Sequence, residues 1–263
     1  MTLRGQRDNA RELRIDSELE QYFVDISVGC PYGLERLAVY HQAVFASMGD
    51  EQLGMFLANG YRRNGNCIYS MRCPGCRSCV PIRLKPADFV PNRNQRRTWK
   101  KNADVTAGIA PLRMSRENLD LLDRHLRTRF PEGKSSAEEY YTGFFISAIS
   151  RCFEIRYRVA DKLIGVAIVD GSADWLNAVY FYFDPAEAWR SPGTLNIIHL
   201  IHFCRRHAIK HLYLGYVIEE VRAMRYKAAF KPHELLLDGQ WQTRSQKPED
   251  RGQEELAASL LVV

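Results

Sequence analysis

The sequence predicts an α+β fold with a mixed, mainly antiparallel sheet flanked by helices. In the C-terminal half, the apolar pattern indicates three consecutive strands followed by a helix, a strand and a helix. In the N-terminal half, strand-like segments surround a stretch rich in cysteine, lysine and arginine. We therefore expect a cysteine-rich basic domain over residues 1–107 and a second, α+β domain over residues 108–263.

The N-terminal half is predicted to contain short elements separated by turns. Alternating apolar residues indicate a strand that starts at Tyr22 and ends at the turn of Gly29 and Pro31. An acidic first turn and the closing pair Asn59-Gly60 favour a short helix. The further expected elements are strands over 34–45 and 67–70, helices over 50–59 and 94–102, and a connector over 107–111.

The C-terminal half has the more regular pattern. Turns at Asp161-Lys162 and Asp170-Gly171 separate three strand signals, so these strands are expected to form an antiparallel meander. The expected elements are helices over 119–130, 138–151, 194–207 and 219–229, and strands over 153–159, 163–169, 175–183 and 211–216.

Positive charge is concentrated in one stretch, residues 61–103. It holds eleven Lys and Arg residues and a single acid, Asp88, which gives a local charge of +10, whereas the whole chain carries +6. Such an asymmetry indicates a polyanionic partner. The apolar fraction of 46% and the charged fraction of 26% are those of an ordinary folded globular protein.

The chain shows no membrane or export signal. No apolar run approaches the length of a membrane span, and the N-terminal residues carry charges of both signs without an apolar core. We therefore expect a cytoplasmic protein with reduced thiols. Its seven cysteines are an odd number, which also argues against a pure disulfide framework.

The spacing Cys73-x2-Cys76-x2-Cys79 suggests a metal site. Three thiolates at this spacing can bind one face of an iron–sulfur cluster or most of a zinc ion. The fourth ligand must come from elsewhere, and Cys30 at a Gly-Cys-Pro turn is the favoured candidate, with Cys67 as the alternative. The other interpretation is that these cysteines are small buried apolar residues.

A basic run follows the cysteines. Trp99 lies within it and could stack on a base, and no acid interrupts it. Contact with phosphate groups is the favoured interpretation, and a solvated surface is the alternative. The basic residues are Arg93, Arg96, Arg97, Lys100 and Lys101.

The order of the C-terminal elements resembles the second half of the GNAT acyltransferase fold. In that fold a helix N-terminus after the meander receives the pyrophosphate of coenzyme A, because exposed N–H groups and the helix dipole bind anions. The corresponding residues here run from Arg190 to Leu195, and the second small residue of the motif is replaced by Leu195. An anion site is therefore expected, whereas coenzyme A is poorly supported.

Together, these stretches resemble the aminoacyl-tRNA–protein transferase family, the arginyl- and leucyl-transferases of the N-degron pathway. The matching pieces occur in the family's order over residues 22–241. They are Cys30-Pro31-Tyr32, Gly60-Tyr61-Arg62-Arg63, Tyr69 with the cysteine run, Phe89-x-Pro91-x-Arg93-x-x-Arg96-Arg97, Tyr180 to Pro185, Arg190-Ser191-x-Gly193, Tyr213 to Tyr216, Met224-x-Tyr226-Lys227 and Phe230-x-Pro232.

The resemblance implies a GNAT-like catalytic domain over 108–263 and transfer of an amino acid from charged tRNA to proteins that begin with Asp or Glu. Leucine is favoured over arginine because the compact length and the spaced cysteines are typical of bacterial members. No cofactor is required, since the aminoacyl ester is already activated. The alternatives are an arginyl-transferase, an acyl-CoA N-acetyltransferase and a non-enzymatic metal-containing nucleic-acid-binding module.

The resemblance also assigns roles. The predicted catalytic residues are Asp184, as the group that accepts or relays the amine proton, and Tyr216 and Lys227, which could handle a proton or hold a carboxylate. The predicted substrate-binding residues are Arg62, Arg63, Arg190, Ser191, Gly193, Thr194 and Tyr226, and the basic run would contact tRNA. The chain departs from the family at Pro192, Val217 and Ala223, which leaves the donor amino acid and the acceptor rule open.

Overall fold

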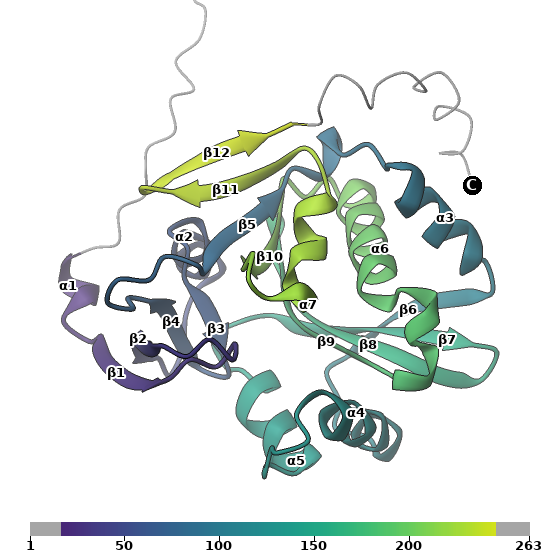
Figure 1. The fold of residues 1–263 in the computed structure, drawn as a ribbon, viewed down its shortest axis with the longest axis horizontal. Helices are drawn as coiled ribbons and strands as arrows, with labels where there is room; N and C mark the ends of the chain where they lie inside the picture. Colours follow the sequence, from purple (N-terminus) through teal and green to yellow (C-terminus); the bar gives the residue numbers. More distant parts are fainter. Residues whose placement is uncertain (1–16, 246–263) are drawn as a thin grey trace, which may run out of the picture.

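The computed structural model describes residues 17–245 of the 263-residue chain, and it confirms a mixed α+β fold built on two sheets (Figure 1). The outermost parts of both expected domains, residues 1–16 and 246–263, lie outside the described residues. Within the described range, no helix has the length and apolar character needed to cross a membrane.

The smaller sheet is antiparallel throughout and has the strand order β1-β2-β4-β3. A short helix α1 (Ser17–Glu20) precedes it, and helix α2 (Asp50–Ala58) packs on it through Leu53, Phe56 and Leu57, which are fully buried. The strands are β1 (Val24–Gly29), β2 (Leu37–Val44), β3 (Arg62–Asn64) and β4 (Cys67–Met71).

The larger sheet has eight strands in the order β12-β11-β5-β10-β9-β8-β7-β6. The predicted meander is confirmed, because β7, β8 and β9 pair antiparallel in sequence order. The strands are β5 (Val80–Leu84), β6 (Val105–Pro111), β7 (Cys152–Val159), β8 (Lys162–Gly171), β9 (Trp175–Phe183), β10 (His211–Val217), β11 (His233–Leu237) and β12 (Gln240–Arg244).

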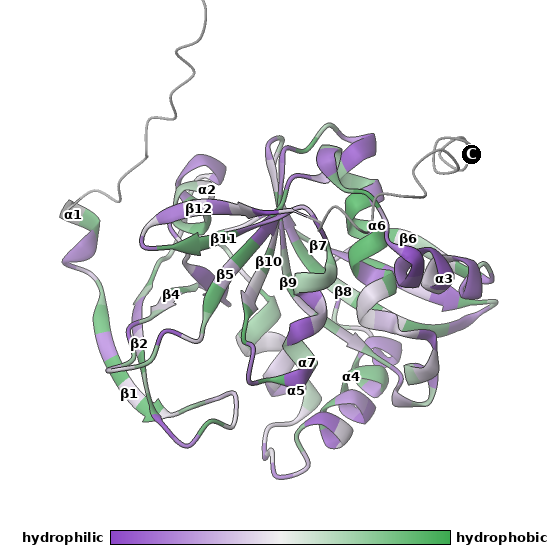
Figure 2. Cartoon of the chain, turned by 45° about the horizontal axis from the view of Figure 1, so that its top comes forward, coloured by the Kyte–Doolittle hydropathy of each residue, from purple (hydrophilic) through white to green (hydrophobic). Residues whose placement is uncertain are grey.

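Helices cover both faces of the larger sheet (Figure 1). On one face α6 (Pro192–Arg206) buries an apolar stripe, and α3 (Arg93–Lys101) lies outside it. In Figure 2, α3 is mainly hydrophilic and α6 mainly hydrophobic, as expected for an outer and an inner helix. The other face carries α4 (Arg116–Arg129), the short α5 (Ala137–Tyr140) and a π-helical turn (Tyr141–Phe145).

Several predicted elements were wrong in type or extent. The expected connector at 107–111 lies within strand β6, and the helix expected over 138–151 ends by Phe145. The helix expected over 219–229 is reduced to α7 (Arg222–Arg225) and a 3₁₀ turn (Tyr226–Ala229). Strand β5 was not predicted, and neither was the β11–β12 hairpin. Because β5 pairs with β10 and β11, a strand from the N-terminal 107 residues completes the larger sheet.

The two sheets are joined by buried polar contacts. Arg63 on β3 donates to both carboxylate oxygens of Asp170 on β8, at 2.8 and 2.6 Å, and both side chains are fully buried. The indole of Trp175 on β9 donates to the carbonyl of Asp50 at the start of α2. These contacts fix the position of the smaller sheet beside β9.

Strands β9 and β10 separate after a short parallel contact. They pair only from His211 and Trp175 to Tyr213 and Asn177. Beyond this point β10 is bulged, and Gly215 has φ +78°, a left-handed conformation that glycine adopts without strain. The sheet therefore opens along the second half of β9.

Candidate functional site

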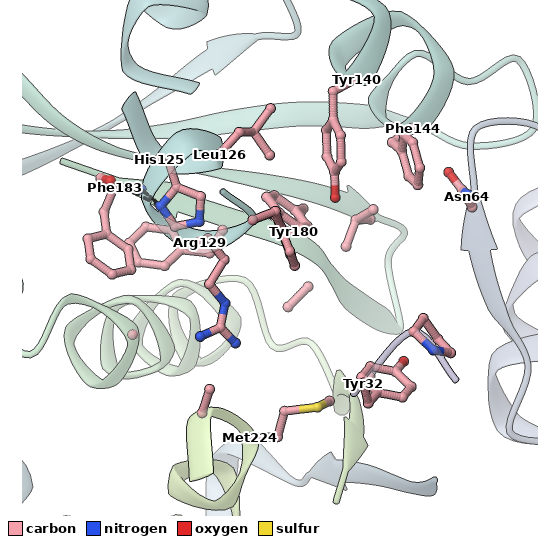
Figure 3. A pocket seen from close by; sticks show the side chains of 18 of the residues that line it. Tyr32, Asn64, His125, Leu126, Arg129, Tyr140, Phe144, Tyr180, Phe183 and Met224 are labelled. Atoms are coloured by element: carbon pink, nitrogen blue, oxygen red, sulfur yellow. Dashed lines mark hydrogen bonds between the residues drawn. The ribbon is translucent and has the colours of Figure 1, made fainter. Parts of the chain in front are cut away.

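A large cavity occupies the opening between β9 and β10 (Figure 3). Its volume is about 1640 Å³, and its walls come from both sheets, α4, the start of α6 and α7. Its lining includes the predicted substrate-binding or catalytic residues Arg62, Arg63, Ser191, Gly193, Thr194, Tyr216, Tyr226 and Lys227. The fold thus brings together residues that are up to 165 positions apart in the chain.

Two cations flank Gly215 at one side of this cavity. A Cβ atom added to Gly215 would lie 3.7 Å from Lys227 Nζ and 4.0 Å from Arg62 Nε. The Arg62 guanidinium donates to the carbonyls of Tyr61 and Gly215, at 2.7 and 2.6 Å, but its buried Nε has no partner among the described residues. Neither cation forms an ion pair with an acid among residues 17–245. A carboxylate would supply the missing acceptor and counter-charge.

Burial sets the protonation of this site. Lys227 Nζ donates to the Tyr216 carbonyl at 2.9 Å, and burial, helped by the neighbouring charge of Arg62, lowers the pKa of Lys227 to about 7. Burial also raises the pKa of Tyr216 far above its usual value, so its phenol stays neutral at physiological pH. The Tyr216 hydroxyl lies 3.5 Å from the Gly60 carbonyl, and its ring lies 5.1 Å from the Arg62 guanidinium carbon.

The start of α6 forms a second part of the cavity wall. Ser191, with φ 58°, precedes Pro192 at the first helical position, and Gly193 packs against Tyr226 so closely that an added Cβ would lie 3.2 Å from its hydroxyl. The N–H groups of Thr194 and Leu195 donate to the Ser191 carbonyl, and Pro192 has none. The dipole of this 15-residue helix favours an anion here. Burial raises the pKa of Tyr226 to about 12.

A smaller cavity of about 440 Å³ adjoins the first. Ser191, Thr194 and Tyr226 line both cavities, and Arg97 and Lys101 of α3 line only the smaller one. The cationic surface of α3 therefore leads to the start of α6.

The two family descriptions that match this chain cover most of the residues that form the site. "Arginine-tRNA-protein transferase, N terminus" matches residues 29–97, and "Arginine-tRNA-protein transferase, C terminus" matches residues 117–237. A protein named aspartate/glutamate leucyltransferase from Thiobacillus denitrificans is 35% identical over 225 residues, which cover 84% of this chain and 94% of that protein. The chain belongs to the arginine-tRNA–protein transferase family.

The chain is also similar to a second leucyltransferase and to one solved structure. A protein of the same name from Alcanivorax borkumensis is 34% identical over 238 residues, covering 88% of this chain and 97% of that protein. Among solved structures, the C-terminal domain of a putative lysylphosphatidylglycerol synthetase from Agrobacterium fabrum aligns with a TM-score of 0.46 and 12% identity, covering 78% of this chain and 66% of that one.

Three of the predicted site residues have partners that favour a structural role. Arg63 forms an ion pair with Asp170. Arg190 forms ion pairs with Asp104 and Glu187, and it lines neither cavity. Asp184 also lies outside both linings and caps the turn of Ala186. Burial acts to raise the pKa of Asp184, but the Ala186 N–H, Lys162 and Arg124 outweigh it and lower the pKa. A carboxylate stabilised in this way is a poor proton acceptor, so the structure does not support the predicted catalytic role of Asp184.

The basic residues of α3 are available for a polyanion. Arg93, Arg97, Lys100 and Lys101 are exposed, and none of them pairs with an acid of the described chain. Trp99 stacks on His202 with ring centroids 4.8 Å apart, yet 41% of its surface stays exposed. This arrangement leaves room for the predicted tRNA contact, which stays a prediction.

The four cysteines predicted to bind metal gather in one region. Burial and, secondarily, the charges of Cys73, Cys30 and Cys76 raise the pKa of Cys79 to about 12. All seven cysteines are free, and within residues 17–245 no three His, Cys, Asp or Glu side chains are arranged as a metal-holding group. As placed, these cysteines do not form a metal site. The iron–sulfur cluster or zinc ion stays a prediction.

One wall of the large cavity is aromatic, and the sequence did not predict it as part of the site. Tyr140 and Phe144 stack with ring centroids 4.3 Å apart, and Tyr180 lies 5.5 Å from Tyr140 (Figure 3). The buried Oδ1 atom of Asn64 in the same cavity has no hydrogen-bond partner within residues 17–245. Tyr180 begins one of the pieces that match the family, whereas Tyr140 and Phe144 carried only an i,i+4 spacing, which also fits an ordinary packed helix.

Proposed function

We propose that this protein transfers leucine from leucyl-tRNA to the α-amino group of proteins that begin with Asp or Glu, on a GNAT-like catalytic domain. The observation that carries the proposal is the pair Arg62 and Lys227, which flank Gly215 in the cavity without a carboxylate partner in the described chain. The acidic side chain of the acceptor supplies that partner. The names of the aspartate/glutamate leucyltransferase relatives support the same acceptor class.

The chemistry of the cavity favours leucine over arginine as the donor. The acids in its lining are Asp123 and Glu139. Asp123 accepts from Arg127 at 2.8 Å, and Glu139 accepts from the Ser136 N–H at 2.9 Å, so each already has a partner within the protein. The wall of Tyr140, Phe144 and Tyr180 instead offers an apolar surface, which suits an aliphatic side chain.

The reaction is the aminolysis of an ester. The neutral acceptor amine attacks the leucyl carbonyl, the C–N bond forms, the C–O bond to the ribose breaks, and the amine proton passes to the departing ribose oxygen. Arg62 and Lys227 orient the acceptor, and the start of α6 receives the nucleotide end of the donor. The edge of β9 beyond Asn177, which β10 leaves unpaired, offers backbone N–H groups to the developing oxyanion.

The direct test is transfer of labelled leucine or arginine from tRNA to peptides that begin with Asp, Glu or Ala. We expect transfer of leucine to the Asp and Glu peptides and little transfer to the Ala peptide. A peptide that begins with Asn matches Asp in shape without its charge and serves as the control. Transfer of arginine alone would support the arginyl-transferase alternative, and equal use of Asp and Asn would contradict the role of the two cations.

The acyl-CoA alternative is tested in the same assay. Labelled acetyl-CoA replaces charged tRNA, with the same peptides as acceptors. We expect no transfer, because Leu195 occupies the position of the second small residue in the pyrophosphate motif. Acetylation in place of leucylation would overturn the proposal.

A further inference from the structure

Helix α4 carries four arginines, and one of them differs from the others. Three pair with carboxylates: Arg116 with Asp120 at 3.5 Å, Arg124 with Asp184 at 3.8 Å, and Arg127 with Asp123 at 2.8 Å. Arg129 makes no side-chain hydrogen bond or ion pair with any residue of the described chain. Figure 3 shows its guanidinium projecting from α4 into the large cavity, in the space between Tyr180 and Met224.

Arg129 faces the start of α6. Its charge partly offsets the effect of burial on the pKa of both Tyr180 and Tyr226, so the guanidinium lies within electrostatic reach of both phenols. The Tyr226 hydroxyl in turn lies against Gly193. Arg129 and the first turn of α6 therefore bound the same part of the cavity from two sides.

Basic residues of α3 line a cavity that joins the part of the large cavity beside Arg129. Arg97 and Lys101 line the smaller cavity, which meets the larger one at Ser191, Thr194 and Tyr226. Lys101 Nζ lies 3.4 Å from Ser191 Oγ. A nucleotide chain that crosses α3 and enters here encounters Arg129 next. The cations at Gly215 form a separate site, at the bulge of β10.

We propose that Arg129 binds the phosphate that joins the terminal adenosine of the charged tRNA to the preceding nucleotide. The planar guanidinium matches two phosphate oxygens and is the residue best suited to fix such a group in register. The inference rests on the proposed function, because it assumes an aminoacyl nucleotide in the cavity. It makes Arg129 a donor-binding residue that places the ester for attack.

The test uses two short donors that differ by this phosphate. Leucyl-adenosine lacks it, whereas the leucyl ester of the dinucleotide CpA contains it. Leucine transfer to an Asp-starting peptide is measured for the wild type, Arg129→Ala, Arg129→Lys and the control Arg116→Ala, which removes an exposed arginine of the same helix outside the cavity. Thermal melting checks that each variant is folded.

We expect Arg129→Ala to lower kcat/KM with the CpA donor by roughly ten- to a hundredfold, as for loss of a hydrogen bond to a charged group. With leucyl-adenosine, kcat/KM should change by less than about twofold, because this donor lacks the phosphate that Arg129 binds. Arg129→Lys should fall between, because it keeps the charge but not the paired donors. Arg116→Ala should match the wild type with both donors.

If Arg129→Ala lowers kcat/KM equally with both donors, or with neither, the assignment of Arg129 is overturned. Leucyl transfer from intact tRNA by the wild type would in that case still support the proposed function. Failure of the wild type with intact leucyl-tRNA would instead overturn the function itself. If the wild type does not use the short esters, calorimetric binding of the corresponding leucyl amides replaces the kinetic readout. The same phosphate-dependent loss of affinity is expected there, and its absence overturns the assignment.

Discussion

Arg62 and Arg63 are adjacent in the sequence and equally buried, each 5% exposed, but they differ in what they contact. Successive side chains of a strand point to opposite sides, so β3 directs Arg63 toward Asp170 on β8 and Arg62 toward Gly215 on β10. Arg63 is thus neutralised within the protein, whereas the Nε of Arg62 in the cavity has no acceptor in the part of the chain that the structure describes. Only the second arrangement leaves charge for a substrate.

Replacement of Lys227 by Ala should weaken the selection for acidic acceptors. The variant removes one of the two cations that hold the carboxylate, so the ratio of kcat/KM for Asp- over Asn-starting peptides should fall at least about tenfold, or about 1.4 kcal/mol. Lys210→Ala is the control, because Lys210 is exposed and pairs with Asp174. An unchanged ratio in Lys227→Ala would exclude Lys227 from acceptor recognition.

The low pKa of Lys227 predicts a pH profile. Burial first, and the charge of Arg62 second, lower this pKa to about 7, so the ammonium loses its proton as the pH rises through that value. Acidic acceptors should then bind less well, while the neutral fraction of the acceptor amine still grows toward about pH 8. We expect kcat/KM for an Asp peptide to peak between about pH 7 and 8. In Lys227→Arg the charge persists, and the decline at high pH should disappear; a profile identical to the wild type would contradict this account.

At the scale of elements, the Asp170 carboxylate accepts hydrogen bonds at the point where β9 and β10 begin to separate. Asp170 on β8 accepts from Arg63 on β3, from Ser150 at 2.9 Å and from Asn177 on β9 at 3.1 Å. Asn177 is also the last β9 residue that pairs with β10. The opening that forms the cavity therefore starts at a buried polar junction between both sheets.

Asp170→Asn should destabilise the protein strongly. The change leaves the buried Arg63 guanidinium without a counter-charge, which typically costs about 3–5 kcal/mol. Thermal melting should show a Tm lower by roughly 6–20 °C, using about 2–4 °C per kcal/mol for a chain of this size. Asp174→Asn, at an exposed ion pair, should move Tm by less than about 4 °C. A small shift in Asp170→Asn would show that the ion pair is dispensable.

Helix α3 should determine the salt dependence of tRNA binding. Arg93 and Arg97 are exposed and unpaired within the described residues, so each can neutralise a phosphate. In the double variant Arg93→Ala/Arg97→Ala, the slope of log affinity against log salt should become shallower by about 1.4–1.8. The control Arg77→Ala/Lys210→Ala removes two exposed cations elsewhere and should keep the wild-type slope. Equal changes in both double variants would indicate general attraction rather than contact at α3.

At the scale of the whole molecule, the packing of α2 on β9 joins the core of the smaller sheet to the larger sheet. Gly54 of α2 lies against the indole of the buried Trp175, and an added Cβ would approach its Nε1 to 2.5 Å. No side chain fits at this distance without movement of the indole or of α2. The small residue is therefore required by the contact between the two sheets.

Gly54→Ala should lower the Tm by a few degrees. Overpacking costs about 1–3 kcal/mol, and the better helix propensity of alanine offsets only about 1 kcal/mol of this. Gly108→Ala on β6 is the matched control, because its added Cβ meets nothing within 4 Å. A Tm at or above the wild type in Gly54→Ala would show that the interface between the sheets adapts.

The sequence by itself determined the elements with strong local patterns and the residues that form the cavity walls near Gly215. The meander of β7, β8 and β9 was predicted from period-2 alternation and turns, and α6 from its apolar stripe. Both signals are local, since they depend on residues a few positions apart. The family resemblance placed Arg62 and Lys227 near substrate, and the structure brings them together at one glycine.

Only the tertiary structure decided how the strands pair and which charges stay free. Strand β5 enters the larger sheet between β10 and β11, more than 120 residues away in the chain, and no local pattern encodes such a partner. In the same way, Arg190 pairs with Asp104 and Asp184 pairs with Lys162. Arg129, which no motif singles out, lines the cavity without a hydrogen-bond or ion-pair partner among residues 17–245. Whether an arginine or aspartate serves structure or substrate depends on the counter-charge that folding brings to it, because a charge satisfied inside the protein has little left to offer a ligand.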